Sequence, residues 1–163
     1  MTGAATTEAA AGPRIGVDGF NAVSETLLIP LAARVVQPRL CPDVALNDPV
    51  AAEWAARLDA DVERFATDRG SMRGACIRTK WFDDQCAAFL AAFPEALGVS
   101  IGCGLNATFA RIGARTDTGR ARWIDLDLPA VIDVRRRLEA PRPNHALAVS
   151  DDNDASWVDA LDW

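Results

Sequence analysis

The chain has 163 residues, of which 50% are hydrophobic and 25% charged, and its formal net charge at pH 7 is -6. This length and composition suffice for the core of one domain and are too small to favour two. The negative charge argues against a nucleic-acid partner, because proteins that bind nucleic acids usually present a clustered basic face. The one basic run, Arg135 to Arg137, falls near the end of an expected helix and indicates a solvated helix terminus.

The cysteine spacing and the hydropathy pattern exclude several further classes. Four cysteines show neither the paired spacing of a metal site nor a short secreted disulfide framework, so we expect reduced thiols and no metal. No apolar run approaches the roughly 20 residues that cross a bilayer, and the N-terminus lacks a basic region followed by an apolar core. We therefore expect a cytoplasmic protein with no membrane partner.

The N-terminal part begins with a segment of low complexity. Residues 1–20 are small and lack periodicity, which predicts a flexible arm. From Ser24, apolar residues at helical spacing predict a first helix; they are Leu27, Leu28, Leu31 and Val35.

Two or three more helices are expected before residue 97. Asp48 followed by Pro49 predicts an N-cap and the first position of a helix. Apolar spacing continues over residues 50–65, either as one helix or as two that separate near residues 58–61. A glycine-containing loop then precedes a helix that we expect to begin at Asp83 or Asp84 and to stop before Pro94.

From Leu97 onward, short strands alternate with helices. Strands are expected at 97–101, 122–127 and 145–150, and helices at 105–113, 129–139 and 154–162. This alternation predicts an α/β fold with a parallel βαβαβ unit, in which the carboxyl ends of the strands meet at one ligand-binding edge.

A glycine turn and two acids carry most of the functional information. Gly102, Cys103 and Gly104 end the first expected strand, and glycines there let backbone amides approach a ligand closely. Asp125 and Asp127 end the second strand, where an acid can accept hydrogen bonds from ribose hydroxyls. The pattern indicates an adenosine-containing cofactor but also fits the loose dinucleotide form, so a nicotinamide-dependent oxidoreductase stays open.

Three segments occur in order: "CIRTKWFDDQCAAFL", "IGCGLNATFARIG" and "RWIDLDLPAVIDVRRRL". Together they resemble the leucine carboxyl methyltransferase and polyketide O-methyltransferase family, from about Ser24 to the end of the chain. The resemblance implies a truncated, Rossmann-like class I methyltransferase fold and S-adenosylmethionine as cofactor. It divides one domain, 21–163, into a helical cap region, 21–96, and a cofactor-binding half, 97–163. The implied activity is methyl transfer to a carboxylate or hydroxyl oxygen of a small molecule, such as a polyketide-type metabolite.

The resemblance also assigns residues to the cofactor. The glycine turn would admit the methionine part and the ribose, and Asp127 matches the ribose-binding acid. Asp125 stays a competitor, because alternating strand side chains point both acids to the same side. Arg78 matches an arginine that pairs with the cofactor's carboxylate, and Arg34 would be a second carboxylate contact by rough analogy.

Ser150 and Asp151 match the positions that contact adenine in the family. The local segment is one residue longer than usual, so Asp152 and Asp154 remain alternatives. Asn106, Ala107 and Thr108 stand where Asp-Thr-Arg is usual, which puts the rigidity of the turn in question.

The sequence names no catalytic residue. His145 is the one histidine and opens the third expected strand, remote from the ligand edge. In the family the sheet continues beyond the point where this sequence stops, so we expect a truncated form or further polypeptide, with 97–101 left as an exposed apolar edge. Such an edge favours a homo-oligomer. A non-catalytic cofactor-binding or oligomerisation module is the alternative function.

Overall fold

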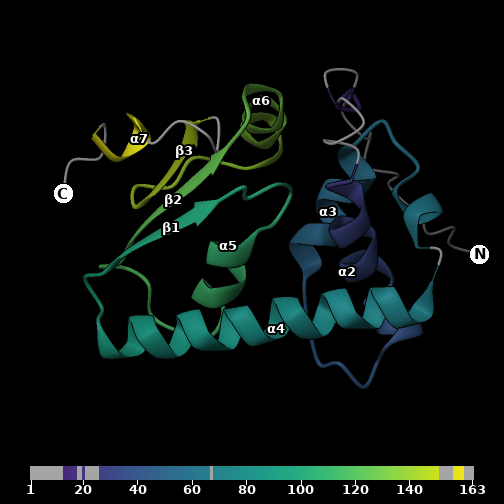
Figure 1. The fold of residues 1–163 in the computed structure, drawn as a ribbon, viewed down its shortest axis with the longest axis horizontal. Coiled ribbons are helices and arrows are strands. Elements are labelled where there is room, and N and C mark those ends of the chain that lie inside the picture. The colour runs from purple at the N-terminus through teal and green to yellow at the C-terminus, as the bar shows by residue number, and fades with distance from the viewer. Residues whose placement is uncertain (1–12, 18–19, 21–25, 67, 151–155, 160–163) are drawn as a thin grey trace, which may run out of the picture.

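The computed structural model describes residues 13–17, 20, 26–66, 68–150 and 156–159. A helical half precedes a small sheet, and one long helix, α4, runs beneath both (Figure 1). In chain order the elements are α2 (Leu28–Leu40), α3 (Pro49–Arg57), the 3-10 turn η1 (Val62–Phe65), α4 (Arg69–Ala92), β1 (Leu97–Ile101), α5 (Thr108–Gly113), β2 (Arg122–Asp127), α6 (Pro129–Leu138), β3 (His145–Val149) and α7 (Ser156–Asp159). The expected α/β class is confirmed.

The three strands form one parallel sheet in the order β1-β2-β3. Both crossover helices cover the same face. Phe109 of α5 stacks on Trp123 of β2, and Arg135 of α6 reaches Asp125 two residues further along that strand. Strand side chains two residues apart share a face, so α5 and α6 lie side by side. Within the described residues β1 is an edge strand, as predicted.

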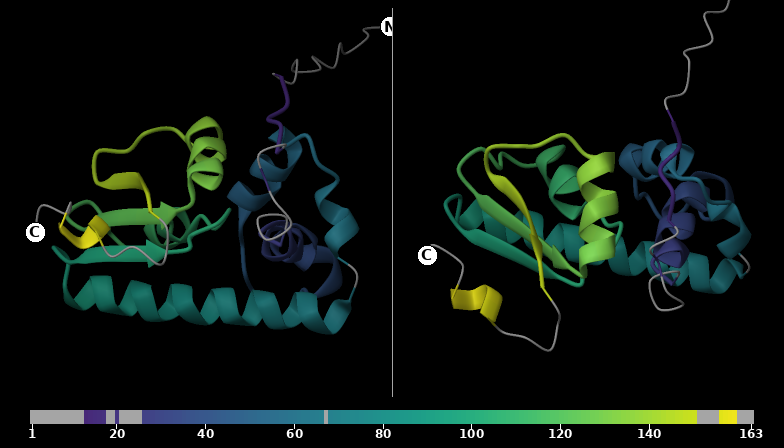
Figure 2. Two further views of the ribbon diagram at one scale, coloured as in Figure 1. Left: turned by 45° about the horizontal axis from the view of Figure 1, so that its top comes forward. Right: turned by 90° about the horizontal axis from the view of Figure 1, so that it is seen from above.

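The helical half packs against α6. Seen from above, α6 lies between the sheet and helices α2 and α3 (Figure 2). Its Val134 and Leu138 share a buried apolar cluster with Leu31 of α2 and Trp54 of α3. The two halves are therefore joined by a continuous core.

The start of α3 agrees with its sequence signal, and its end decides an open alternative. The Asp48 carboxylate accepts a hydrogen bond from the backbone N–H of Ala51 at 3.0 Å, and Pro49 occupies the first turn. The chain leaves the helix at Leu58, whose backbone is extended, and forms η1 separately. The two-helix alternative is therefore confirmed.

The start predicted for the next helix is wrong. Helix α4 begins at Arg69, where Asp68 caps it by accepting from the backbone N–H of Ser71 at 2.6 Å, well before Asp83. Its first turns are held by tertiary packing, since Met72 and Cys76 are buried against α2. This burial outweighs the low helix propensity of the glycines at 70 and 74. Despite its length α4 is too polar to cross a bilayer, and the described part of the chain contains no other helix that could.

The ends of the chain are described in part. Within the expected arm, Ile15 is buried and forms a parallel bridge with Leu58. Its backbone N–H donates to the Arg57 carbonyl, and its carbonyl accepts from Asp59, each at 2.8 Å. Part of the segment predicted to be flexible is thus anchored to the core. The last helix is described over Ser156–Asp159.

Candidate functional site

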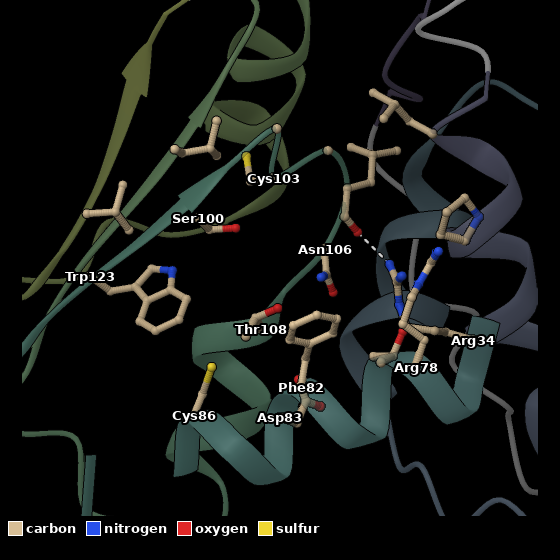
Figure 3. Close-up of a pocket in the computed structure, with 18 residues that line it drawn as sticks. Arg34, Arg78, Phe82, Asp83, Cys86, Ser100, Cys103, Asn106, Thr108 and Trp123 are labelled. Atoms are coloured by element: carbon tan, nitrogen blue, oxygen red, sulfur yellow. Dashed lines mark hydrogen bonds between the residues drawn. The ribbon is translucent and has the colours of Figure 1, made fainter. Parts of the chain in front are cut away.

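A cavity of about 450 Å³ lies beside the free edge of β1, at its carboxyl end (Figure 3). Its walls come from α2, α4, β1 and the glycine turn, and its volume lies within the range of small-ligand pockets. The lining includes Leu27, Arg34, Arg78, Phe82, Asp83, Ser100, Gly102, Cys103, Gly104, Thr108 and Trp123. Four of the predicted site residues therefore meet at one cavity, namely Arg78, Gly102, Cys103 and Gly104.

The turn requires glycine at two positions. Gly102 has a φ of 62° and Gly104 a φ of 53°, in the left-handed region that other residues rarely adopt. A Cβ on Gly104 would also lie 3.0 Å from the Leu27 side chain. Cys103 between them is buried, and burial raises the pKa of its thiol far above the ordinary value. A thiolate at Cys103 is thus strongly disfavoured, which argues against a nucleophilic role.

Asp127 connects the end of β2 to the turn. One carboxylate oxygen accepts from the backbone N–H of Gly104 at 2.6 Å, and the other from that of Leu128 at 2.8 Å. The side chain is nearly buried and does not line the cavity. In this structure Asp127 therefore orders the glycine turn.

Asp125 has other partners, which separates it from Asp127 where side-chain alternation could not. It forms an ion pair with Arg135 at 2.6 Å and accepts from the Trp123 indole at 2.8 Å. It also contacts His145 at 2.9 Å. Burial alone would raise the pKa of Asp125, but the hydrogen bond with His145 and the charge of Arg135 outweigh it and hold that pKa below its usual value.

The prediction of a solvated basic run is wrong for Arg135. Its guanidinium is fully buried, whereas Arg136 is exposed. Helix periodicity turns neighbouring residues to different faces, and α6 directs Arg135 to the core.

Two guanidinium groups stand at one end of the cavity, those of Arg34 and Arg78 (Figure 3). Arg78 is exposed and forms no hydrogen bond or ion pair with any other described residue. Arg34 is buried, donates to the Leu105 carbonyl at 2.6 Å, and lies 2.9 Å from an Asp48 carboxylate oxygen. Burial lowers the pKa of Arg34 to about 10 although Asp48 opposes the shift, so the group stays charged at neutral pH. This end of the cavity suits an anion.

Arg34 belongs to a buried cluster of charged side chains. Arg111 of α5 binds both oxygens of Asp83 on α4, at 2.7 and 2.9 Å, and reaches Asp48 at 2.9 Å. With Arg34, the cluster contains two cations and two carboxylates from four different segments. Sequence reasoning missed it, because no local pattern indicates which distant charges will pair.

The altered segment after the turn takes part in this cluster. The Asn106 side-chain oxygen and the Thr108 hydroxyl both accept from Arg111, at 2.8 and 3.3 Å. The turn is thus anchored to α5 without the usual Asp-Thr-Arg residues.

The predicted adenine contacts lie away from the cavity or outside the described residues. The Ser150 backbone N–H donates to the Asp127 carbonyl at 3.0 Å, which places Ser150 at the carboxyl edge of the sheet, but it does not line the cavity. Asp151, Asp152 and Asp154 lie outside the described residues.

Other lining residues were not predicted. Phe82, Ser100, Thr108 and Trp123 also line the cavity, with Trp123 on the side away from Arg34 (Figure 3). Phe82 could have been found, because it lies one helical turn beyond Arg78 in the same sequence segment. Trp123 was expected in the core, where it is buried, and it also lines the cavity.

Two comparisons with known proteins show the family of this chain. The family model described as leucine carboxyl methyltransferase matches residues 27–162. The tetracenomycin polyketide synthesis O-methyltransferase TcmP of Streptomyces glaucescens is 34% identical over 142 residues, which are 87% of this chain and 51% of that relative. The chain thus spans about half the length of the relative it matches.

Proposed function

We propose, because the chain belongs to the leucine carboxyl methyltransferase family, that it binds S-adenosylmethionine in the cavity beside β1 and serves methyl transfer to an oxygen of a small molecule. The observation that carries the proposal is Arg78, an arginine without a partner among the described residues that lines a cavity within the volume range of small-ligand pockets. A guanidinium can hold a carboxylate through two parallel hydrogen bonds. Arg78, supported by Arg34, would bind the carboxylate of the cofactor's methionine part.

The glycine turn would receive the next part of the cofactor. Gly102, Cys103 and Gly104 present backbone without bulky side chains at the cavity wall, and a Cβ at Gly104 would narrow it toward Leu27. Asp127 stays the predicted ribose contact although it does not line the cavity, because it binds the Gly104 N–H of the turn and each of its carboxylate oxygens can accept a second hydrogen bond. Ser150 and Asp151 remain the predicted adenine contacts.

The residues around the cavity bind and orient. When bound, the cofactor supplies an electrophilic methyl group. The one carboxylate among the described lining residues, Asp83, is held on both oxygens by Arg111, so it is not free to accept a proton from a methyl acceptor. The contribution of this half is therefore positioning, which can lower a barrier substantially without a general base.

For the acceptor we propose a hydroxyl or carboxylate of a polyketide-type small molecule. The support is the 34% identity to TcmP, whose name describes an O-methyltransferase of polyketide synthesis. The division of one domain at residue 96 is proposed on the family resemblance, and cytoplasmic location stays a prediction of the sequence analysis.

Calorimetric titration with S-adenosylhomocysteine tests cofactor binding. Arg78→Ala should weaken affinity by about tenfold, the loss expected for a hydrogen bond to a charged group. Arg73→Ala is a matched control, because Arg73 lies on the same helix, pairs with Asp43 and does not line this cavity. Equal effects of the two variants would contradict the assigned carboxylate site.

The free edge of β1 supports a proposal from a different class, a module that associates through this edge. Ile101 on this strand is 56% exposed, and Phe82 and Phe89 of helix α4 and Phe93 at its C-cap are exposed as well. Sedimentation should detect a homo-oligomer that Ile101→Lys dissociates, because charge on an edge strand opposes pairing. An oligomer that binds no cofactor would favour the non-catalytic alternative. If a nicotinamide dinucleotide stabilised the fold and S-adenosylmethionine did not, an oxidoreductase would be favoured.

A further inference from the structure

Arg135 contacts the glycine turn without lining the cavity. One of its terminal nitrogens donates to the Gly104 carbonyl at 3.0 Å and to the Asn106 carbonyl at 3.2 Å. The carbonyl between them, that of Leu105, accepts from Arg34. Three successive carbonyls of the turn are therefore bound by buried guanidinium groups.

The remaining contacts of Arg135 fix its position. Its other terminal nitrogen donates to Asp125 at 2.6 Å, and its Nε donates to Glu139 at 2.9 Å. The guanidinium also lies 5.0 Å from the centre of the Trp54 ring. Arg135 thus joins the sheet, helix α3 and the turn, a combination that the planar fork of arginine permits and the single ammonium of lysine does not.

We infer that Arg135 is a positioning residue for cofactor binding, acting through the carbonyls of Gly104 and Asn106. This inference rests on the proposed function. Two glycines with positive φ leave the turn free to adopt many conformations unless other contacts restrict it. Hydrogen bonds from ionised donors are about twice as strong as neutral ones, so Arg135 restricts the carbonyls while leaving the cavity wall bare. Arg135 itself does not line the cavity.

The charges around Arg135 explain why the turn depends on this residue. The side chains of Asp125, Glu139 and His145 meet beside Arg135, with one nitrogen or oxygen atom of each within 4.8 Å of the others. Arg135 is the cation that binds both carboxylates. Removing it would leave these carboxylates without their main counter-charge. Arg135→Lys is therefore the informative change, because it keeps the charge and loses the fork.

The experiment compares S-adenosylhomocysteine affinity and amide hydrogen exchange of residues 103–106 at a temperature where every variant is fully folded. Arg135→Lys should weaken affinity about tenfold and accelerate exchange in the turn. Arg57→Lys is the chemical control, because Arg57 also donates to two carbonyls, those of Arg137 and Leu138, but does not touch the turn. Leu138→Ala is the stability control on the same helix.

A purely structural role would lower the melting temperature of Arg135→Lys and leave the affinity of the folded protein unchanged, which would overturn the inference. An equal loss of affinity in Leu138→Ala would overturn it as well. If the original chain binds no S-adenosylhomocysteine, the proposed function fails, and unchanged exchange in Arg135→Lys would separately refute control of the turn. Should Arg135→Lys not fold, the double variant R135M with D125N removes the pair together and is judged by the same two measurements.

Discussion

The buried pair of Asp83 and Arg111 allows a quantitative prediction. Asp83→Asn should destabilise the fold by about 3 kcal/mol, the lower end of the range for breaking a buried ion pair. The lower end applies because Arg111 keeps its contact with Asp48 at 2.9 Å. The change leaves two arginines, Arg34 and Arg111, sharing one carboxylate in the core. For a chain of this length, that loss corresponds to a fall in melting temperature of roughly 6–12 °C.

Urea denaturation of Asp83→Asn measures the free energy of unfolding directly. The next residue gives a matched control, since Asp84 carries the same group on the same helix but pairs with Lys80 and Arg115 at side chains 36–42% exposed. Asp84→Asn should change the free energy of unfolding by about 0.5 kcal/mol or less. If both variants lost the same small amount, the view that the Asp83 cluster holds α4 against α5 would be refuted.

Three further outcomes follow from the same contacts. Gly104→Ala should cost about 1–2 kcal/mol because of its positive φ, whereas Gly74→Ala, with open space around its Cβ, should gain about 0.5–1 kcal/mol; chemical denaturation compares them. The folded protein should protect Cys103 from iodoacetamide at pH 8, because burial raises the pKa of its thiol, and labelling as fast as in urea would contradict this. The pKa of Asp125 is lowered in the fold, mainly by the hydrogen bond with His145, so its stabilising contribution is present above about pH 4 and lost below it. The stability difference between the original chain and Asp125→Asn should therefore shrink as pH falls below about 4, and a constant difference would count against this pairing.

Signals carried by a few adjacent residues were sufficient for much of the architecture. The cap at Asp48, the extent of β1 and the glycine turn agree with the structure because each depends on local backbone geometry. The start of α4 did not follow from local signals, since packing of Met72 and Cys76 against α2 extends the helix through two glycines.

The candidate site shows the same division. Its glycine turn was predictable from sequence, because the turn conformation depends on adjacent glycines. Arg78 was predictable because it lies in a short segment that resembles the family. The different partners of Asp125 and Asp127, the burial of Arg135 and the pairing of Asp83 with Arg111 follow only from the folded chain. Each of these charged side chains is paired or hydrogen-bonded with a group on another element. Burying a charge is unfavourable without such a partner, and the partner comes close only when the chain folds. Short-range conformational preference therefore determined the elements and the turn, and long-range charge compensation in the core decided which polar residues order the turn and which face the cavity.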